Sequence, residues 1–294
     1  MLQSGPIVSS AWLAEAKRSL GKRLVIAEAS WTPSGEATEY DAGHIPGAIH
    51  VNTDGFENGS PRWHLRPVPE LHAVIGALGI APDSTVVVYG HQTIAAARVW
   101  WILEYAGVRR VLYLDGGVEA WRRAGFALES KPNALPRVHF AAPPRAGVLA
   151  TTEYVRAHRE QAILADVRSG REYLGEVSGY SYLEAKGRIP GARALGDGSD
   201  SAHVYQNPDG TLRRVGEIRD RWQAAGILSG NREIVFYCGS GWRSSLAFLY
   251  ARAMGLRRIR NYSDGWSGWS TIYEQVNGEW RQRPSANPVA NGER

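Results

Sequence analysis

The sequence predicts an α/β protein made of two tandem domains, each a parallel sheet with helices on both faces. Three observations support this prediction. The chain has 294 residues, about twice the length of an average domain. Two long segments resemble each other along the chain. Within each copy, short apolar runs alternate with helical apolar spacing, which is typical of a parallel sheet covered by helices.

The internal repeat is clearest in the second half of each copy. Residues 86–121 match residues 234–269 without a gap, so that Trp121 falls opposite Trp269. Upstream, the stretch His44-Ile-Pro-Gly-Ala matches Arg188-Ile-Pro-Gly-Ala. A repeating unit of this length indicates a duplicated domain rather than a solenoid.

A proline-rich stretch separates the two copies. Four prolines fall within residues 131–147, a composition that predicts a stiff and partly extended linker. We therefore assign residues 6–130 to the first domain, 131–146 to the linker and 147–285 to the second domain. Residues 286–294 lack periodicity and are predicted to form a flexible tail.

Strands and helices follow from the apolar pattern within each copy. Runs rich in β-branched and aromatic residues predict buried strands at 86–89, 111–114 and 234–237. Helical spacing predicts two helices that end near a glycine and two that follow Ser or Thr caps, at residues 94–106, 244–254, 9–18 and 150–158. In parallel sheets of this kind, ligands bind beyond the carboxyl ends of the strands.

Composition argues against several classes of protein. The net charge is +5, 21% of the residues are charged, and no long run of one sign occurs. This pattern argues against a disordered chain and against a nucleic-acid partner. The longest apolar stretches are far shorter than the roughly 20 residues that a membrane span needs, so no membrane association is expected. Because no secretory signal is visible, a cytoplasmic location is predicted, and a periplasmic one stays open if an export segment was removed.

Cys238 is the only cysteine in the sequence. An intramolecular disulfide and a zinc site with several thiolates are therefore excluded, and the eight histidines show no His-Glu-x-x-His pattern. We expect neither a metal nor another cofactor. A reactive Cys238 would have no resolving cysteine in its own chain.

The surroundings of Cys238 favour a nucleophile. The stretch Cys238-Gly-Ser-Gly-Trp-Arg243 follows the predicted strand 234–237 and leads into a predicted helix. A strand, a glycine-containing turn and a helix N-terminus together form an anion cradle, which favours a thiolate. Arg243 adds a fixed positive charge. The alternative is a small buried residue at the end of a strand.

Taken together, these motifs resemble the rhodanese family of sulfurtransferases in its tandem-domain form. The resemblance covers about residues 8–275 and rests on the two Ile-Pro-Gly-Ala motifs, the Cys238 loop, and the Asp-Gly stretches that follow each predicted active-site helix. It implies two tandem rhodanese-like domains with catalysis in the second. In the first copy, Gly90 and Ala95 stand where the second has Cys238 and Arg243. The first domain would then wall the cleft and supply substrate contacts.

The size of the cysteine loop separates two chemistries. Cys238 and Arg243 enclose four residues, whereas related phosphatases and arsenate reductases enclose five in a wider loop that accepts an oxyanion. The resemblance thus implies transfer of a sulfane sulfur from thiosulfate or 3-mercaptopyruvate, through a Cys238 persulfide. The expected partners are a small anionic donor and a thiol, cyanide or thioredoxin-like acceptor. The alternative is a persulfide carrier or interaction module for a partner protein, with little turnover of free substrate.

The resemblance also implies further site residues. The rest of the loop would contact the substrate through Gly239, Gly241, Trp242 and Ser244. The small loop residues resemble the mercaptopyruvate type, in which a loop serine belongs to a Ser-His-Asp set. Carried over to this chain, the catalytic set is Ser240, His64 and Asp54.

Two more arginines resemble family residues that bind the anionic group of the donor. They are Arg168 and Arg171, of which Arg171 is favoured, although a surface ion pair with Glu172 or Glu176 is its alternative. Asp166 is expected to orient the loop or an arginine. The pair Trp242-Arg243 departs from mercaptopyruvate enzymes and resembles a bacterial subgroup of thiosulfate sulfurtransferase-like proteins, so the donor stays open. Trp242 would either shield the persulfide or pack at a domain interface.

Overall fold

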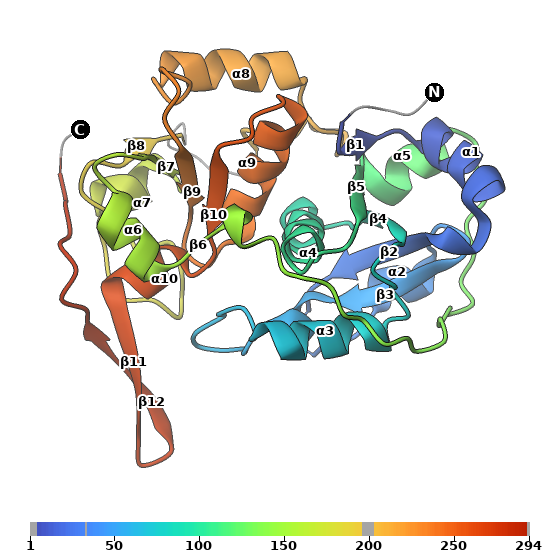
Figure 1. The fold of residues 1–294 in the computed structure, drawn as a ribbon, viewed down its shortest axis with the longest axis horizontal. Coiled ribbons are helices and arrows are strands. Elements are labelled where there is room, and N and C mark those ends of the chain that lie inside the picture. The colour runs from blue at the N-terminus through green and yellow to red at the C-terminus, as the bar shows by residue number, and fades with distance from the viewer. Residues whose placement is uncertain (1–4, 33, 196–202, 293–294) are drawn as a thin grey trace. The chain divides into compact units, whose positions relative to one another are not determined.

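The computed structural model describes residues 5–32, 34–195 and 203–292, and it divides the chain into two compact units (Figure 1). Unit 1 comprises the chain up to Ala146 except residues 58–65, together with residues 206–213. Unit 2 comprises the remainder. The linker 131–146 counts with unit 1.

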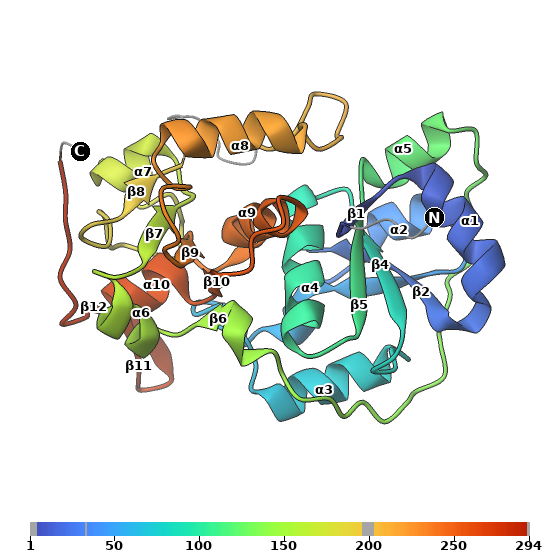
Figure 2. The same ribbon diagram turned by 45° about the horizontal axis from the view of Figure 1, so that its top comes forward.

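Unit 1 is built on a five-stranded parallel sheet with the strand order β1-β5-β4-β2-β3. Its strands are β1 Ile7–Val8, β2 Leu24–Ser30, β3 Ala48–Asn52, β4 Thr85–Tyr89 and β5 Arg110–Leu114. Its helices are α1 Ser10–Leu20, α2 Thr38–Ala42, α3 Val68–Ala77, α4 Thr93–Tyr105 and α5 Gly117–Arg123. Figure 2 shows α3 and α4 on one side of this sheet and α1 and α5 on the other.

Unit 2 repeats this plan with the strand order β6-β10-β9-β7-β8. Its parallel strands are β6 Leu149–Ala150, β7 Ile163–Asp166, β8 Arg193–Ala194, β9 Ile234–Tyr237 and β10 Ile259–Tyr262. Its helices are α6 Thr152–His158, α7 Gly170–Leu174, α8 Val215–Ala224, α9 Trp242–Ala253 and α10 Gly265–Ser270. The predicted fold class, two tandem α/β domains with parallel sheets, is confirmed.

The predicted elements are present with small shifts at their ends. The strand 234–237 is β9 without change, and α9 begins two residues before the predicted start. The caps of α1 and α6 are also present, since Ser9 Oγ accepts the Trp12 N–H at 3.2 Å and Thr151 Oγ1 accepts the Tyr154 N–H at 3.1 Å. These hydrogen bonds satisfy donors that a helix leaves without a partner at its first turn.

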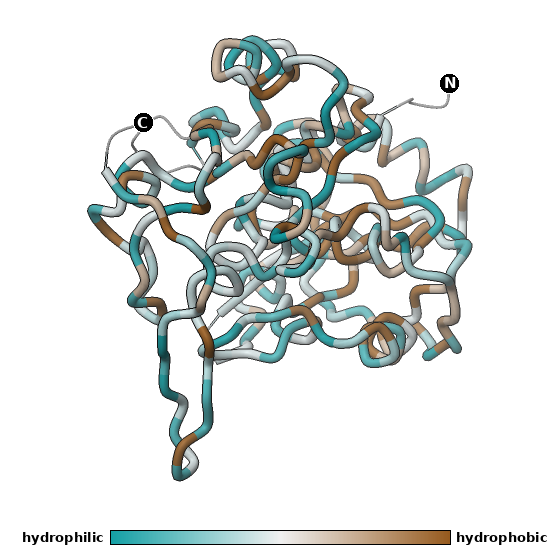
Figure 3. The backbone as a smooth tube through the Cα atoms, turned by 60° about the vertical axis from the view of Figure 1, so that its left-hand side comes forward, coloured by the Kyte–Doolittle hydropathy of each residue, from teal (hydrophilic) through white to brown (hydrophobic). Residues whose placement is uncertain are grey.

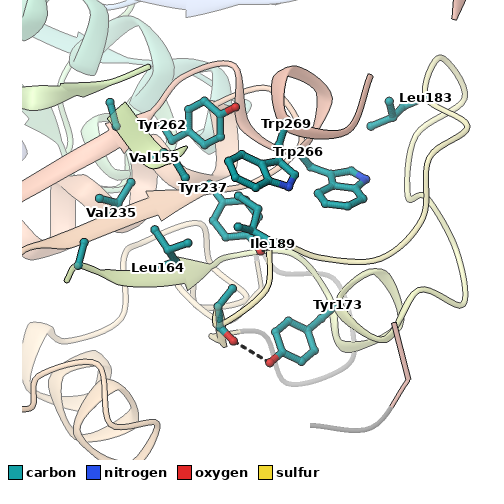
Figure 4. Close-up of a cluster of buried hydrophobic side chains, with 13 residues drawn as sticks. Val155, Leu164, Tyr173, Leu183, Ile189, Val235, Tyr237, Tyr262, Trp266 and Trp269 are labelled. Atoms are coloured by element: carbon teal, nitrogen blue, oxygen red, sulfur yellow. Dashed lines mark hydrogen bonds between the residues drawn. The ribbon is translucent and has the colours of Figure 1, made fainter. Parts of the chain in front are cut away.

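The core of unit 2 gathers around the aromatic residues Tyr237, Trp266 and Trp269, all of them fully buried (Figure 4). At its edge, the Tyr173 hydroxyl donates to the Ala192 carbonyl at 2.8 Å. In unit 1, Tyr89 and Trp121 belong to the corresponding core cluster. The duplicated aromatic positions found in the sequence are therefore mainly core positions, which burial alone explains.

A two-stranded hairpin follows α10 in unit 2. It pairs β11 Thr271–Val276 with β12 Glu279–Pro284, and its turn is Asn277-Gly278 with both φ angles positive. Such a turn matches the twist of the two strands. Figure 3 shows the hairpin as a projecting and largely hydrophilic loop. Near its base, the Gln282 amide donates to the Tyr182 carbonyl at 2.8 Å.

The described part of the C-terminal tail, residues 286–292, forms hydrogen bonds with the rest of unit 2. Ala290 and Arg188 exchange backbone hydrogen bonds at 2.9 and 3.0 Å. The Gly292 N–H donates to the Leu174 carbonyl at 3.0 Å, and the Arg188 guanidinium donates to the Gly292 carbonyl at 3.1 Å. Backbone pairing of this kind needs no apolar periodicity, so the sequence pattern does not reveal it.

Each unit also contains a short segment from the other half of the chain; we call residues 58–65 and 206–213 the exchanged segments. Residues 58–65 belong to unit 2, where the guanidinium of Arg62 lies 4.6 Å from the ring centre of Trp280. Such cation–π contacts stabilise a surface segment modestly.

The other exchanged segment, 206–213, belongs to unit 1 and covers the carboxyl end of its sheet. The Leu212 N–H donates to Asp115 Oδ1 at 2.7 Å, directly after β5. A small cavity of about 80 Å³ remains between this segment and Gly90, the residue that follows β4.

Candidate active site

Cys238 lies where β9 ends, at the carboxyl edge of the unit 2 sheet. Residues 238–241 form the turn between β9 and α9, and Cys238 is 1% exposed. Gly241 precedes the helix with a φ of 87°, in the left-handed region where a side chain would be strained. The chain therefore passes directly from the strand to the helix N-terminus, as the sequence predicted.

The environment of Cys238 favours a thiolate. Burial alone would raise the pKa of its thiol, but the charge of Arg243 and the N–H groups of Ser244 and Ser240 outweigh burial, so that the pKa is lowered. The Ser244 hydroxyl also lies 3.7 Å from Cys238 Sγ. A thiolate held by N–H donors beside a cation is the reactive form of cysteine.

Arg243 is held in place by a carboxylate and a phenol. Its Nη2 and Nη1 donate to the two carboxylate oxygens of Glu172 at 2.7 and 2.9 Å. Nη2 also donates to the Tyr180 hydroxyl, and the guanidinium lies 5.1 Å from the centre of that ring. Bidentate pairing fixes both the position and the orientation of a guanidinium.

Glu172 reaches Arg243 because a capping box starts α7 at this point. Glu172 Oε2 accepts the Ser169 N–H at 3.0 Å and the Ser169 hydroxyl at 2.9 Å. Burial would raise the pKa of Glu172, but its hydrogen bonds and the charge of Arg243 lower it instead. The sequence assigned no chemistry to Glu172. The Ser-x-x-Glu spacing could have predicted the cap, but not the ion pair with a residue far along the chain.

Tyr180 lies over the cysteine loop and was also missed by sequence reasoning. Its hydroxyl accepts the Gly239 N–H at 2.8 Å, besides the Arg243 donor. A Cβ at Gly239 would lie 2.1 Å from a carbon of the Tyr180 ring, so only glycine fits there. Burial raises the pKa of Tyr180 well above its usual value, and the hydroxyl keeps its proton. No residue pattern near Tyr180 points to this contact.

Further rings adjoin the loop through Tyr182. The Tyr182 hydroxyl lies 3.2 Å from Ser240 Oγ, and its ring centre lies 5.2 Å from that of Tyr180 and 6.2 Å from that of Trp63. Trp63 belongs to the exchanged segment 58–65. We call Trp63, Tyr180 and Tyr182 the ring cluster.

The predicted Ser-His-Asp set is only partly placed by the structure. Ser240 contacts Tyr182, while the ring of His64 lies edge-on to Tyr273 with the centres 6.5 Å apart. Asp54 belongs to unit 1, where burial raises its pKa. The set Ser240, His64 and Asp54 therefore stays a prediction.

The two arginines predicted to bind the donor have other partners. Arg168 is fully buried, and its guanidinium donates to both oxygens of Asp166 at 2.9 and 2.6 Å. Asp166 thus orients an arginine, as expected, and it also accepts the Tyr237 hydroxyl at 2.6 Å. The Arg171 side chain is 64% exposed and pairs with Glu176 at 3.1 Å, which is the surface ion pair given as its alternative. Binding of the donor by Arg168 and Arg171 therefore stays a prediction, whereas Arg243 lies next to Cys238 and lowers its pKa.

Within residues 5–32, 34–195 and 203–292, His, Cys, Asp and Glu side chains nowhere gather in the groups of three that could hold a metal ion. In the same part of the chain, no helix combines the length and the apolar character needed to cross a membrane.

A family model for the rhodanese-like domain matches the chain twice, over residues 14–124 and 151–272. The chain is 39% identical over 277 residues to the Escherichia coli protein named thiosulfate sulfurtransferase YnjE. The match covers 92% of this chain but 60% of that relative, so the chain spans less than two thirds of its length. The crystal structure of YnjE superimposes with a TM-score of 0.84 and 36% identity, covering 98% of this chain and 69% of that one.

Other relatives carry different names. The 3-mercaptopyruvate sulfurtransferase of Escherichia coli is 30% identical over 243 residues, which are 79% of this chain and 82% of that protein. A structure of an EanB variant in complex with ergothioneine matches with a TM-score of 0.85 and 31% identity, over 98% of this chain and 70% of that one. Since the family model matches both halves of the chain, this protein belongs to the rhodanese-like sulfurtransferase family, as a member with two tandem domains.

Proposed function

We propose that this protein transfers a sulfane sulfur from a small anionic donor to a thiophilic acceptor, through a persulfide on Cys238. The observation that carries the proposal is the environment of Cys238, a buried thiol whose pKa is lowered beside Arg243 at the N-terminus of α9. Membership of the sulfurtransferase family supports the same reaction class.

The reaction with thiosulfate needs no proton transfer. The Cys238 thiolate attacks the outer sulfur of the donor, the bond between the two donor sulfurs breaks, and its electron pair leaves with sulfite. The N–H groups of Ser240 and Ser244, which already face the Cys238 sulfur, would stabilise the negative charge of the persulfide. A thiolate, cyanide or thioredoxin-like acceptor then attacks the outer sulfur and releases the Cys238 thiolate.

The reaction with 3-mercaptopyruvate moves a proton as well. Attack of Cys238 on the donor sulfur breaks the carbon–sulfur bond, and the proton of the donor thiol ends on the carbon of pyruvate. Ser240 and its neighbour Tyr182 are hydroxyls close to the loop and could hold that proton during transfer. The predicted partners His64 and Asp54 would act in this branch only.

The first test compares the two donors in steady-state sulfur transfer to cyanide, with Cys238→Ser as the blank. A higher kcat/KM for 3-mercaptopyruvate that falls in Ser240→Ala would support the serine set. A preference for thiosulfate that Ser240→Ala leaves intact would assign donor binding to the loop and Arg243. If neither donor gives turnover that depends on Cys238, the protein does not catalyse sulfur transfer from thiosulfate or 3-mercaptopyruvate in solution. A stable Cys238 persulfide seen by mass spectrometry would then favour the carrier alternative.

The ring cluster favours a second candidate acceptor. A relative of known structure is an anaerobic ergothioneine biosynthesis enzyme in complex with its natural substrate, trimethyl histidine. Aromatic faces attract a trimethylammonium group, and Tyr180, Tyr182 and Trp63 offer three such faces next to the Cys238 loop. The test incubates the persulfidated protein with trimethyl histidine and looks for the thiolated product by mass spectrometry. Return of all the sulfur to added cyanide would exclude this acceptor.

A further inference from the structure

In unit 1 the linker lies along the amino-terminal edge of the sheet, next to α3 (Figure 2). The Val138 N–H donates to the Gly76 carbonyl at 3.0 Å. Further on, the Arg145 N–H donates to the Tyr105 carbonyl at 2.8 Å, and the Arg145 guanidinium donates to the Val108 carbonyl at 2.8 Å. The linker is therefore bound as an extended chain across the ends of α3 and α4.

Two glycines show how closely the linker approaches. Gly79 and Gly107 follow the ends of α3 and α4, and both have positive φ angles. A Cβ at Gly79 would lie 2.3 Å from the Cβ of Leu135, and one at Gly107 would lie 2.6 Å from the carbonyl oxygen of Pro143. Unit 1 thus has a groove shaped for an extended chain.

The corresponding edge of unit 2 is open. Gly226 and Gly255 follow α8 and α9 there, as Gly79 and Gly107 follow α3 and α4. A Cβ at Gly255 would meet nothing within 4 Å, and one at Gly226 would meet only the guanidinium of Arg193. A pocket of about 430 Å³ lies at this edge, lined by α8, residues 227–232 and residues 255–258. We call this pocket the unit 2 groove.

The unit 2 groove carries a marked excess of positive charge. Four arginines and one carboxylate line it: Arg219, Arg232, Arg257, Arg258 and Asp220. Three of the arginines donate to backbone carbonyls: Arg219 to Met254 at 3.1 Å, Arg258 to Asn231 at 2.7 Å, and Arg232 to Glu160, Gln161 and Ala162 at 2.7–2.8 Å. Within the part of the chain that the structure describes, none of the four forms an ion pair, whereas exposed arginines such as Arg122 do.

The unit 2 groove has a cation where the matching edge of unit 1 has an aromatic ring. Arg219 on α8 stands at the position of His72 on α3, and the His72 ring packs edge-on against Phe140 of the linker with the centres 5.0 Å apart. An aromatic contact with a bound chain is thus replaced by a cation. Arg257, in contrast, has a counterpart in unit 1, since Arg109 follows the same turn.

We propose that the unit 2 groove binds an extended acidic segment of a partner protein, in the way that unit 1 binds its own linker. The duplicated fold supports the extended form of the occupant, because the same edge of unit 1 already holds one. The four arginines support the acidic character, because guanidinium groups pair with carboxylates through two parallel hydrogen bonds.

The groove is separate from the cysteine site. Ile234, at the start of β9, lines the groove, whereas Cys238 follows the last residue of the same strand. The inference therefore goes beyond the proposed sulfur transfer and does not depend on it. A partner bound at the groove would be held at the amino end of the sheet while the carboxyl end stays accessible.

The test uses the full chain and a labelled peptide. The probe is residues 135–145 of the linker with Arg137→Glu, His139→Glu and Arg145→Glu, and binding is followed by fluorescence anisotropy at low salt. We expect a Kd tighter than about 100 µM that weakens as salt is added. The double variant Arg219→Glu/Arg257→Glu should weaken binding at least about tenfold. The variant Arg109→Glu, at the matching turn of unit 1, should leave binding unchanged.

Three results would overturn the proposal. They are no binding of the acidic peptide, binding that survives Arg219→Glu/Arg257→Glu, and equally tight binding of the unmodified basic linker peptide. Thermal unfolding of both variants checks that they are folded. If the unmodified protein fails to bind the peptide but retains Cys238-dependent sulfur transfer, the groove proposal alone is rejected. If it binds the peptide but shows no Cys238-dependent sulfur transfer, the sulfur-transfer proposal alone is rejected.

Discussion

The two units have the same strand order, but the turn after the central strand holds a cysteine in unit 2 and a glycine in unit 1. In unit 2, Cys238 follows β9 and is surrounded by N–H donors and Arg243. In unit 1, Gly90 follows β4, and a Cβ there would lie 2.1 Å from the carbonyl oxygen of Ala29. The first unit therefore has no room for any side chain where the second has its thiol. In unit 1 the backbone itself, and not only the absence of a cysteine, leaves no space for a nucleophile at this turn.

A second difference lies one strand away. In unit 2 the buried carboxylate of Asp166 is neutralised by Arg168. In unit 1, Glu28 occupies the matching position on β2 and pairs in register with Tyr89, but Ser30 replaces the arginine. Burial raises the pKa of Glu28, and the nearby Tyr89 hydroxyl offsets this only in part. Unit 2 therefore has a buried ion pair, Asp166 with Arg168, at this strand end, whereas unit 1 has a buried carboxyl group, Glu28, without an arginine two residues later.

The strongest test of this comparison moves the nucleophile between the units. Cys238→Ser should lower sulfur transfer at least about 1,000-fold, because the persulfide has no other cysteine on which to form. Adding Gly90→Cys should restore nothing and should lower the unfolding temperature, because the Ala29 carbonyl must move. Steady-state transfer and thermal unfolding measure both effects. Recovered activity in the double variant Cys238→Ser/Gly90→Cys would show that the turn of unit 1 can also hold a reactive cysteine, which would contradict this comparison.

The next test removes the cation. Arg243→Ala should lower kcat/KM about 100-fold, because a charge that stabilises the thiolate is lost. The pKa of Cys238 should rise, so iodoacetamide should react with it only at higher pH than in the wild type. Since Arg243→Ala alone leaves Glu172 buried without this partner, Arg243→Ala/Glu172→Gln is the matched variant that separates folding from reactivity. An unchanged pH profile of alkylation in both variants would contradict the assignment.

A smaller effect is expected from the phenol over the loop. Tyr180→Phe keeps the ring above Gly239 but removes the acceptor for the Gly239 N–H and Arg243, and we expect kcat to fall about tenfold. Tyr182→Phe, which removes only the contact with Ser240, is the control for thiosulfate as donor. Equal losses in the two variants, or none in Tyr180→Phe, would remove Tyr180 from the positioning of Arg243.

The smallest expected effect concerns stability. Because the folded-state pKa of Glu28 is raised, its stabilising contribution is complete below its unfolded pKa and is lost as the pH rises through the folded value. Glu28→Gln should thus gain stability over the wild type as pH rises, by about 1 kcal/mol for each unit of pKa displacement. Asp166→Asn should lose stability instead, because Arg168 loses its partner. Urea unfolding at acid and neutral pH checks both, and a Glu28→Gln gain independent of pH would contradict the argument.

The sequence was sufficient for the parts of the site that are local in the chain. The strand, the glycine turn, Cys238 and Arg243 lie within ten residues, so pattern and spacing could predict their arrangement. Glu172 and Tyr180 meet Arg243 only through the fold, and no local pattern relates them to it. Arg168 and Arg171 show the converse, since a motif placed both near the site while burial and a surface ion pair gave them other partners.

The fold itself was predicted for a related reason. The two repeats show the same apolar pattern, so each supports the strands and helices predicted for the other. The order of these elements follows from local patterns and needs no knowledge of contacts between distant residues. What the pattern could not supply is pairing without periodicity, as in the C-terminal tail, where Ala290 exchanges backbone hydrogen bonds with Arg188.

The exchanged segments set a limit on how this gene can be divided. Ala146 marks the boundary between the repeats, yet a protein that ends there would lack residues 206–213, and its complement would lack residues 58–65 with Trp63 of the ring cluster. Each half would be made with part of its own surface missing. A cut at the repeat boundary would therefore remove from each unit one of the segments that complete it.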